Sequence, residues 1–306
     1  MAEKIITPDQ HEITVKKTRI ITPGQVVLMI VIAIFSLTCL LPFVNVAAVS
    51  LSSKSAILRG DVSFWPVEFN TTAYEAIFSD KSMIHSLVYT VIITVVYTVF
   101  SMIMTILMAY PLTKGRLKGR NFFSFLALFT MYFSGGTIPI YLNIKELGLL
   151  DTPWALILPG MLSTYNMIIL KSFFQALPKE LEEAAIIDGA NDFQVLLRVY
   201  LPLSMASLAT LTLFYAVGKW NSFQDALYYI STKAYQPLQL KLYHIIKGSQ
   251  AVDVAALEGG ASTVATSVSE SIEPATIIFA TLPILVVYPF VQRYFVAGVT
   301  IGAVKG

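Results

Sequence analysis

The chain has 306 residues, of which 56% are hydrophobic and 13% are charged, and its mean hydropathy is +0.69. Because soluble domains carry about 25% charged residues, this composition indicates an integral membrane protein. The formal net charge of +2 and the lack of a basic run with interleaved aromatic residues argue against nucleic-acid binding, and the single cysteine, Cys39, excludes an intrachain disulfide and a thiolate metal cluster.

Six segments are long and apolar enough to cross a membrane, which takes about 20 residues. In chain order they are Gln25–Val49, Ile84–Tyr110, Asn121–Leu142, Pro153–Phe174, Pro202–Trp220 and Ala275–Phe295. The first is too long for the apolar core of a signal peptide and has no clear cleavage site, so we interpret it as an uncleaved span. The sequence therefore predicts an all-α membrane protein with six transmembrane helices.

The positive charges predict that both termini lie in the cytoplasm. Lysine and arginine gather in the segments that this orientation places inside, most densely in TKGRLKGR between the second and third spans, as the positive-inside rule requires. The second outside loop is rich in small and polar residues, which is typical of a mobile loop. The predicted organisation is a cytoplasmic tail at 1–24, a six-span domain at 25–298 with long outside loops at about 50–83 and 223–274, and a cytoplasmic tail at 299–306.

One cytoplasmic segment, at about 175–200, is acidic although it lies between apolar spans. Pro178 suits the first turn of a helix, and the carboxylates that follow it complement the positive end of the helix dipole. Gly189 stands where a left-handed C-terminal cap is expected. Asn191 and Gln194 have the spacing of a capping box, which predicts a second helix running to Pro202. We expect a helix, a bend at glycine and a second helix.

Two helices this short are unstable alone, so they must pack against something. An amphipathic helix lying on the lipid surface is one interpretation, but such helices usually carry lysine on the polar face. This segment carries carboxylates, and the adjacent Ala184 and Ala185 permit a close approach by another backbone. The pattern favours docking onto a cytoplasmic protein.

The same segment resembles the signature of a known family. Glu183-Ala184-Ala185, three residues, Gly189, nine residues and Val199-Tyr200-Leu201-Pro202 resemble the EAA motif (EAA-x3-G-x9-I-x-L-P) of permease subunits of binding-protein-dependent ABC importers, with valine for isoleucine. Within that family the chain looks like the carbohydrate permeases of the maltose type and of Gram-positive polysaccharide or oligosaccharide importers. Supporting stretches are GGTIPIYLNIKELGLLDTPWALILPG, LPKELEEAAIIDGA, KWNSF and VAGVTIGAVKG.

The resemblance implies a type I (MetI-like) permease fold in a bacterial cytoplasmic membrane. It implies partners: a second homologous permease, two ATPase subunits that bind ATP and Mg, and a lipid-anchored extracellular solute-binding protein. This chain lacks the phosphate-binding motif G-x-x-x-x-G-K-[ST], so it is expected to bind no cofactor or metal and to catalyse no reaction. The residues implied to couple the spans to the ATPase are Glu183, Ala184, Ala185, Asp188, Gly189, Leu201 and Pro202.

Aromatic and hydrogen-bonding side chains that suit a sugar close the fifth span. An amide or a lysine facing lipid is costly, which favours a place on the cargo path. Aromatic side chains near a span end also form the membrane-interface belt, and Lys219 can extend to the interface, so both interpretations stay open. The predicted path residues are Tyr215, Lys219, Trp220, Asn221 and Phe223.

Three other functions are weighed against a carbohydrate importer. An ion-coupled secondary transporter predicts carboxylates within the spans, yet the acidic residues fall in loops or at span boundaries. A membrane-embedded enzyme lacks support, since neither HExxH nor GxSxG is present. A permease for another solute, such as a peptide, remains an alternative.

Overall fold

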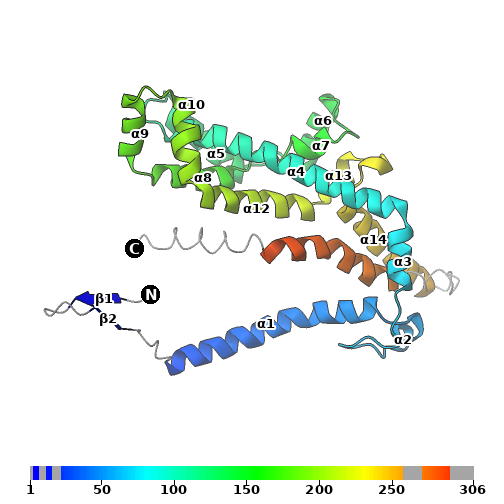
Figure 1. Cartoon of the computed structure of the whole chain (residues 1–306). Coiled ribbons are helices and arrows are strands. Elements are labelled where there is room, and N and C mark those ends of the chain that lie inside the picture. The colour runs from blue at the N-terminus through cyan, green and yellow to red at the C-terminus, as the bar shows by residue number, and fades with distance from the viewer. Residues whose placement is uncertain (1–2, 7–11, 16–21, 258–270, 290–306) are drawn as a thin grey trace.

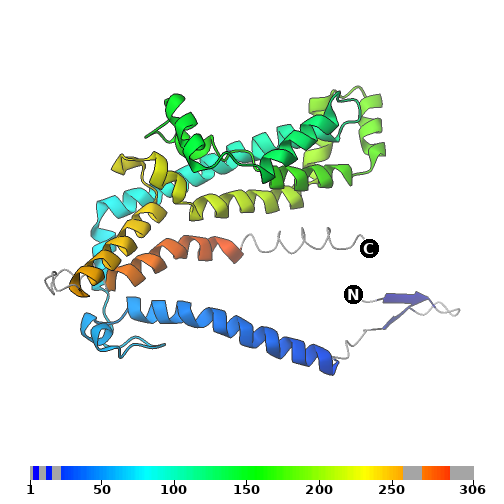
Figure 2. The ribbon, with the colours of Figure 1, turned by 180° about the vertical axis from the view of Figure 1, so that it is seen from behind.

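The computed structural model describes residues 3–6, 12–15, 22–257 and 271–289 of the chain, and Figures 1 and 2 show it from two opposite sides. β1 (Glu3–Ile6) and β2 (Glu12–Val15) form an antiparallel pair in which Glu3 is opposite Val15. The sequence did not predict this pair. The other described elements are helical, in agreement with an all-α membrane domain.

The helical elements follow one another along the chain. In order they are α1 (Pro23–Ser50), α2 (Lys54–Arg59), α3 (Thr72–Ser79), α4 (Lys81–Ala109), η1 (Pro111–Thr113), α5 (Arg120–Tyr132), α6 (Thr137–Glu146), α7 (Trp154–Ile157), α8 (Thr164–Gln175), α9 (Lys179–Ile187), α10 (Asp192–Val195), η2 (Leu196–Tyr200), α11 (Leu201–Leu203), α12 (Met205–Asn221), α13 (Gln224–Tyr229), η3 (Lys233–Tyr235) and α14 (Leu238–Leu257). A last described helix covers Ser271–Pro289.

Three described helices are long and apolar enough to cross a membrane: α1, the helix Lys81–Thr113 that contains α4, and Ser271–Pro289. Two bent pairs raise the number to five if each forms one span. α5 and α6 meet at an angle of 114°, and the segment Asp192–Leu203 meets α12 at 84°. The third predicted span is therefore broken where the hydropathy pattern predicted a continuous helix. The fifth, Pro202–Trp220, is mostly the single helix α12, and its bend lies at the predicted start of the span. The last predicted span extends beyond Pro289, outside the described residues.

The fourth predicted span, Pro153–Phe174, is not a continuous helix. α7 and α8 are separated by residues 158–163, where Pro159 supplies no N–H for a helical hydrogen bond. The Tyr97 hydroxyl of α4 donates to the Gly160 carbonyl at 2.6 Å. A Cβ atom at Gly160 would lie 3.1 Å from that hydroxyl oxygen, so glycine permits this close approach. The predicted number of six spans is thus not confirmed by helix length.

α4 packs against α8 and α12 to form the core of the helical bundle (Figure 1). Leu170 and Phe174 of α8 and Leu211 and Tyr215 of α12 are buried there. The Tyr215 hydroxyl lies 2.6 Å from the Thr105 hydroxyl of α4 and accepts from the Ser163 N–H at 3.1 Å. These bonds satisfy polar groups in a core where α4 also buries Thr98 and Ser101.

α1 stands apart from this bundle in both views (Figures 1 and 2). None of its 18-residue apolar window is buried within the described chain. The helix is apolar on every side, which is typical of a helix surrounded by lipid or by other apolar helices.

The predicted outside loop at 223–274 contains regular structure. α13, η3 and the whole of α14 lie in it, and Leu238 and Leu240 of α14 are buried. The Leu238 N–H donates to the Thr90 hydroxyl of α4 at 2.8 Å, which fixes the start of α14 on the bundle. The first part of this loop is therefore ordered on α4. The small and polar stretch at 248–271, for which a mobile loop is expected, is helical as far as Leu257 and stays untested beyond it. Residues 258–270 lie outside the described part of the chain.

The segment between α1 and α3 is held by an ionic network around Glu68. Its carboxylate accepts hydrogen bonds from the Ser53 hydroxyl, from the Ser55 hydroxyl at 2.8 Å and from Arg59 Nη2 at 3.0 Å. Arg59 Nε also donates to Asp61 at 2.7 Å. The bonds from Ser53, Ser55 and Arg59 lower the pKa of Glu68 from 4.5 to about 2.

Acid should loosen this segment only near the lowered pKa of Glu68. A carboxyl group whose pKa is lowered by folding stabilises the fold at any pH above the pKa that it has in the unfolded chain. This contribution disappears as the pH falls through the pKa in the folded chain, which is about 2 for Glu68. We expect limited pepsin digestion in nanodiscs to leave residues 51–70 intact at about pH 4 and to cut them near pH 2. Glu68→Gln should be cut at both values. Equal resistance of this variant and the wild type at the higher pH would contradict the role of the network.

Candidate coupling site

The acidic segment folds as the capping pattern predicts. α9 is followed by Gly189 at φ +83°, in the left-handed region that glycine favours. The Gly189 N–H donates to the Ile186 carbonyl at 3.0 Å and the Ala190 N–H to the Ala185 carbonyl at 2.9 Å, which together form a Schellman motif. Gly189 therefore ends α9 and reverses the chain direction.

The second helix begins at the predicted cap. The Asn191 side chain accepts from the Gln194 N–H at 2.9 Å, and the Gln194 side chain accepts from the Asn191 N–H at 2.9 Å. This capping box starts α10, which continues through the π-helical turn η2 and α11. Pro178 precedes α9 as its cap residue instead of standing in its first turn. Figure 1 shows α9 and α10 together at one end of the bundle.

A buried cation ties this segment to the connection between α4 and α5. Lys114 is only 8% exposed, and its Nζ lies 2.6 Å from the Glu182 carboxylate and 3.2 Å from the Tyr200 hydroxyl. The ammonium also lies 4.3 Å from the ring centroids of both Tyr110 and Tyr200, where cation–π attraction adds to the ion pair. We call these four residues, Tyr110, Lys114, Glu182 and Tyr200, the lysine clamp.

Hydrogen bonding keeps the clamp carboxylate charged. Burial by itself raises the pKa of Glu182, but hydrogen bonds from Lys114 and from the Tyr200 hydroxyl, at 2.6 Å, outweigh it and lower the pKa below the ordinary value. Glu182 is thus an anion at neutral pH, paired with a buried cation. The pair joins α9 to the loop that follows α4.

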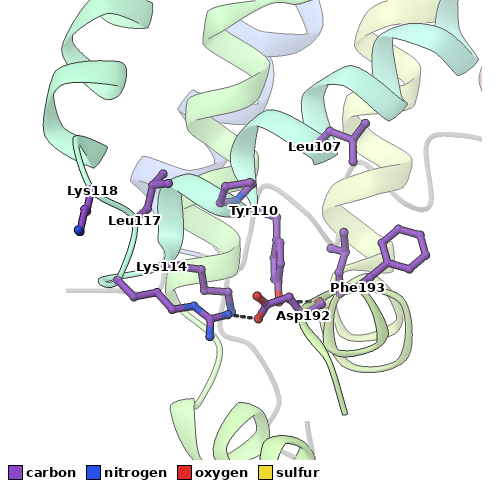
Figure 3. A pocket seen from close by; sticks show the side chains of 10 residues that line it. Leu107, Tyr110, Lys114, Leu117, Lys118, Asp192 and Phe193 are labelled. Atoms are coloured by element: carbon purple, nitrogen blue, oxygen red, sulfur yellow. Dashed lines mark hydrogen bonds and ion pairs between the residues drawn. The ribbon is translucent and has the colours of Figure 1, made fainter.

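A second set of contacts joins the start of α10 to the same loop. The Tyr110 hydroxyl donates to the backbone carbonyl of Asp192 at 3.0 Å, and Arg116 forms an ion pair with the Asp192 carboxylate. Figure 3 shows Tyr110, Lys114 and Asp192 converging on a groove of about 410 Å³. Phe193 and Leu117 line its other sides. The segment is held to the end of α4 at both α9 and α10.

The remaining surface of the segment is exposed and partly apolar. No residue of α9 is buried, and Ile187 is 85% exposed. Leu181, Ile186 and Phe193 are also exposed. Large apolar side chains gathered on an exposed surface indicate an interaction site for a protein or a membrane. We call the exposed surface of α9 and α10 the docking face.

The predicted coupling residues divide between this face and the interior. Leu201 and Ala185 are half-buried, and Ala185 packs on the bundle core. The exposed ones are Glu183, Ala184, Asp188, Gly189 and Pro202. Sequence reasoning missed Lys114 and Glu182. The only signal was the charged run TKGRLKGR, in which nothing distinguishes Lys114 from its exposed neighbour Lys118.

The predicted cargo-path residues occupy two environments. Tyr215, Lys219 and Trp220 are buried, and Trp220 Nε1 donates to the Ala280 carbonyl at 3.3 Å. Asn221 is exposed, and Phe223 is half-buried and stacks on Tyr243 with ring centroids 4.9 Å apart.

The buried lysine of this group is held by three elements. Lys219 Nζ donates to the Leu156 carbonyl of α7, lies 3.5 Å from the Asp225 carboxylate of α13, and lies 4.9 Å from the ring centroid of Tyr97 on α4. These contacts orient the ammonium toward partners within the chain. Among the described residues, no group of three His, Cys, Asp or Glu side chains is placed to hold a metal ion.

Three comparisons place this architecture among known proteins. Protein LplC of Bacillus subtilis is 45% identical over 87% of this chain and 90% of its own length. The polygalacturonan/rhamnogalacturonan transport system permease protein YtcP of the same species is 42% identical over 89% of this chain and 94% of its own length. A chain in the crystal structure of a bacterial ABC transporter involved in the import of the acidic polysaccharide alginate superimposes with a TM-score of 0.80, with 33% identity, over 91% of this chain and 100% of its own.

The family model of the binding-protein-dependent transport system inner membrane component matches residues 18–300. The match covers the whole helical bundle, the lysine clamp and the docking face. Such subunits transport and do not catalyse, and the ATPase of these importers is a separate subunit. The chain therefore belongs to the inner-membrane permease components of binding-protein-dependent ABC importers.

Proposed function

We propose that this permease takes up an oligosaccharide or polysaccharide fragment delivered by an extracellular solute-binding protein. The observation that carries the importer assignment is the docking face, an acidic and apolar surface at one end of the bundle in the EAA segment. The cargo class rests on the relatives, two of which are described as a polygalacturonan/rhamnogalacturonan permease and as part of an alginate importer.

In the proposed mechanism the docking face is seated on an ATPase subunit. Glu183 contacts the ATPase, the glycine bend sets the angle of α9, and Ala184 permits close approach. When two ATPases close on ATP, the lysine clamp transmits the movement of α9 to the end of α4. The buried ion pair supports this route because it joins the two elements directly.

A second homologous permease completes the pathway. α1 supports this proposal, since its apolar surface is left uncovered by the described chain and a neighbouring subunit would cover part of it. We propose six spans with both termini in the cytoplasm, which puts residues 175–200 on the cytoplasmic side together with the tails at 1–24 and 299–306. The concentration of lysine and arginine in residues 113–120 supports this orientation.

Cargo is proposed to pass the outer end of α12. Asn221 and Phe223 are accessible there, whereas Tyr215, Lys219 and Trp220 shape the wall from inside the chain. Sugars suit such a path because aromatic faces and amides bind them without buried charge.

The importer assignment is tested by purifying the tagged chain from its native membrane in mild detergent. Mass spectrometry is expected to find a second permease, an ATPase and a solute-binding protein. Fragments of alginate, polygalacturonan and neutral glycans are then titrated against that binding protein, with peptides as the control cargo. Recovery of the chain alone, active in ion-driven transport, would instead favour a secondary transporter.

Replacing the buried lysine tests the division of the path residues. Lys219→Met leaves the Leu156 carbonyl without its donor, and we expect a loss of about 1–3 kcal/mol in the free energy of unfolding. Cargo preference should stay as in the wild type, whereas Asn221→Ala should weaken transport without lowering stability. Thermal unfolding and uptake assays on both variants give the result. A stable Lys219→Met variant with altered cargo preference would place Lys219 on the path itself.

A further inference from the structure

Aromatic side chains are exposed in the segment that joins α1 to α3. Trp65 is 82% exposed and Phe69 is 70% exposed, and Phe64 is exposed beside them. Isolated apolar residues on a surface need no explanation, but three aromatic rings within six residues form a continuous sequence patch. We call these three side chains, Phe64, Trp65 and Phe69, the aromatic tip.

The tip stands on a rigid base. The Ser53 N–H donates to the Val67 carbonyl at 3.1 Å, and the Asn70 N–H donates to the Leu51 carbonyl at 2.9 Å. The Val67 N–H donates to the Ser52 hydroxyl at 3.0 Å. The ionic network around Glu68 closes the same base. The exposed rings are therefore presented in a fixed place and not on a free loop.

One hydrogen bond fixes the depth of the tip relative to α1. The side-chain amide of Asn45 donates to the Ser63 carbonyl at 2.6 Å, so the chain returns along α1 past its end at Ser50. The 28 residues of α1 are roughly 42 Å long at about 1.5 Å per residue. This length matches a bilayer with its headgroup layers, about 40–45 Å around a core of about 30 Å.

Asn45 lies roughly 7 Å before the end of α1, at the level of the headgroup layer. The aromatic tip begins immediately after Ser63 and so lies at that level. Tryptophan favours this layer because its ring is apolar while its indole N–H can be hydrated. A binding protein would approach from the water beyond the end of α1, which is less consistent with a tip folded back along the helix.

We propose that the aromatic tip is a membrane-interface anchor that inserts into the headgroup layer of the bilayer. Asn45 holds the tip at this depth, and the tip fixes the end of α1 in the membrane. The apolar window of α1 is not buried within the described chain, and only its last turn is packed, where Ala48 and Ser50 are buried. Such an anchor therefore restrains a helix that the rest of the described chain holds only at its end.

Spin labels measure the depth directly. The purified transporter is reconstituted in nanodiscs with Cys39→Ser and Trp65→Cys, and a nitroxide is attached at position 65. Collisions with oxygen are expected to exceed collisions with a water-soluble nickel complex severalfold. The matched control is a label at Lys54→Cys, an exposed residue at the start of α2, where the nickel complex should dominate.

Asn45→Val then removes the donor that holds Ser63. The label at position 65 should become more mobile and more accessible to nickel, while the label at position 54 should not change. Three results would overturn the anchor: a label at 65 as accessible to nickel as that at 54, a label protected only after the binding protein is added, or a label inaccessible to both reagents, which indicates contact with the second permease.

Discussion

Charge reversal at Glu183 is expected to uncouple ATP hydrolysis from transport while the chain still inserts into the membrane. The side chain is exposed on the docking face, so its replacement disturbs no packing within the chain. Reversing a charge at a protein interface brings like charges together, and this repulsion costs several kcal/mol. We expect the transport-stimulated ATPase activity of Glu183→Lys to fall to the basal rate in proteoliposomes.

Gly189→Pro should have the same effect by a different route. Proline fixes φ near −65° and cannot adopt the +83° of Gly189, and it removes the N–H that donates to Ile186. Gly189→Ala is a milder change of about 1 kcal/mol, because alanine adopts the left-handed region with strain. Neither alanine nor proline adds a polar group, and the two differ in how strongly they distort the bend. A larger loss of coupling in Gly189→Pro than in Gly189→Ala would therefore be due to the geometry of the bend.

The control for both changes is Glu146→Lys, a charge reversal at an exposed residue of α6, far from α9 in Figure 1. It should leave the stimulated activity unchanged. Membrane insertion is followed by the yield of folded chain. Normal coupling in both Glu183→Lys and Gly189→Pro would mean that the acidic segment is not the coupling element.

Loss of the clamp cation is expected to destabilise the chain, because Lys114 is buried. Lys114→Met leaves the Glu182 carboxylate partly buried without its cation, and breaking such a pair costs about 3 kcal/mol. The variant should unfold at a lower temperature and lose coupling, since α9 is then released from the end of α4. Lys118→Met, in the same loop but exposed, should behave as the wild type.

The double variant Lys114→Met with Glu182→Gln distinguishes charge burial from lost contact. Glutamine removes the unpaired charge and keeps an acceptor for the Tyr200 hydroxyl, so stability should partly recover. Coupling should stay impaired, because the ion pair that joins α9 to the loop is still absent. Full recovery of coupling in the double variant, or wild-type stability of Lys114→Met, would contradict the role of the clamp.

Local chemistry explains why the coupling segment could be predicted. The bend depends on Gly189, and the second helix depends on Asn191 and Gln194, which bond to backbone groups three residues away at most. Such signals are contained within a few consecutive residues. The long apolar helices α1 and α4 were equally predictable, since a run of about 20 apolar residues is a signal carried by composition alone.

The breaks within the bundle were not predictable in this way. A hydropathy window records composition, so it counted residues 153–174 as one span although Pro159 interrupts the helix. Whether a break is tolerated depends on a partner for the freed backbone groups, and here Tyr97 of α4 supplies it. Composition was equally uninformative about α14. Its sequence is rich in small residues, but its apolar residues pack on α4.

The sequence by itself determined the membrane character of the chain, the family signature and the helix–bend–helix of residues 178–202, because these follow from composition and from contacts between near neighbours. Only the tertiary structure decided that Glu182 faces inward while Glu183 stays exposed. Two adjacent carboxylates look alike in a sequence, and what separates them is a buried lysine from a distant loop. Burial and pairing depend on which elements meet, and that is settled by packing.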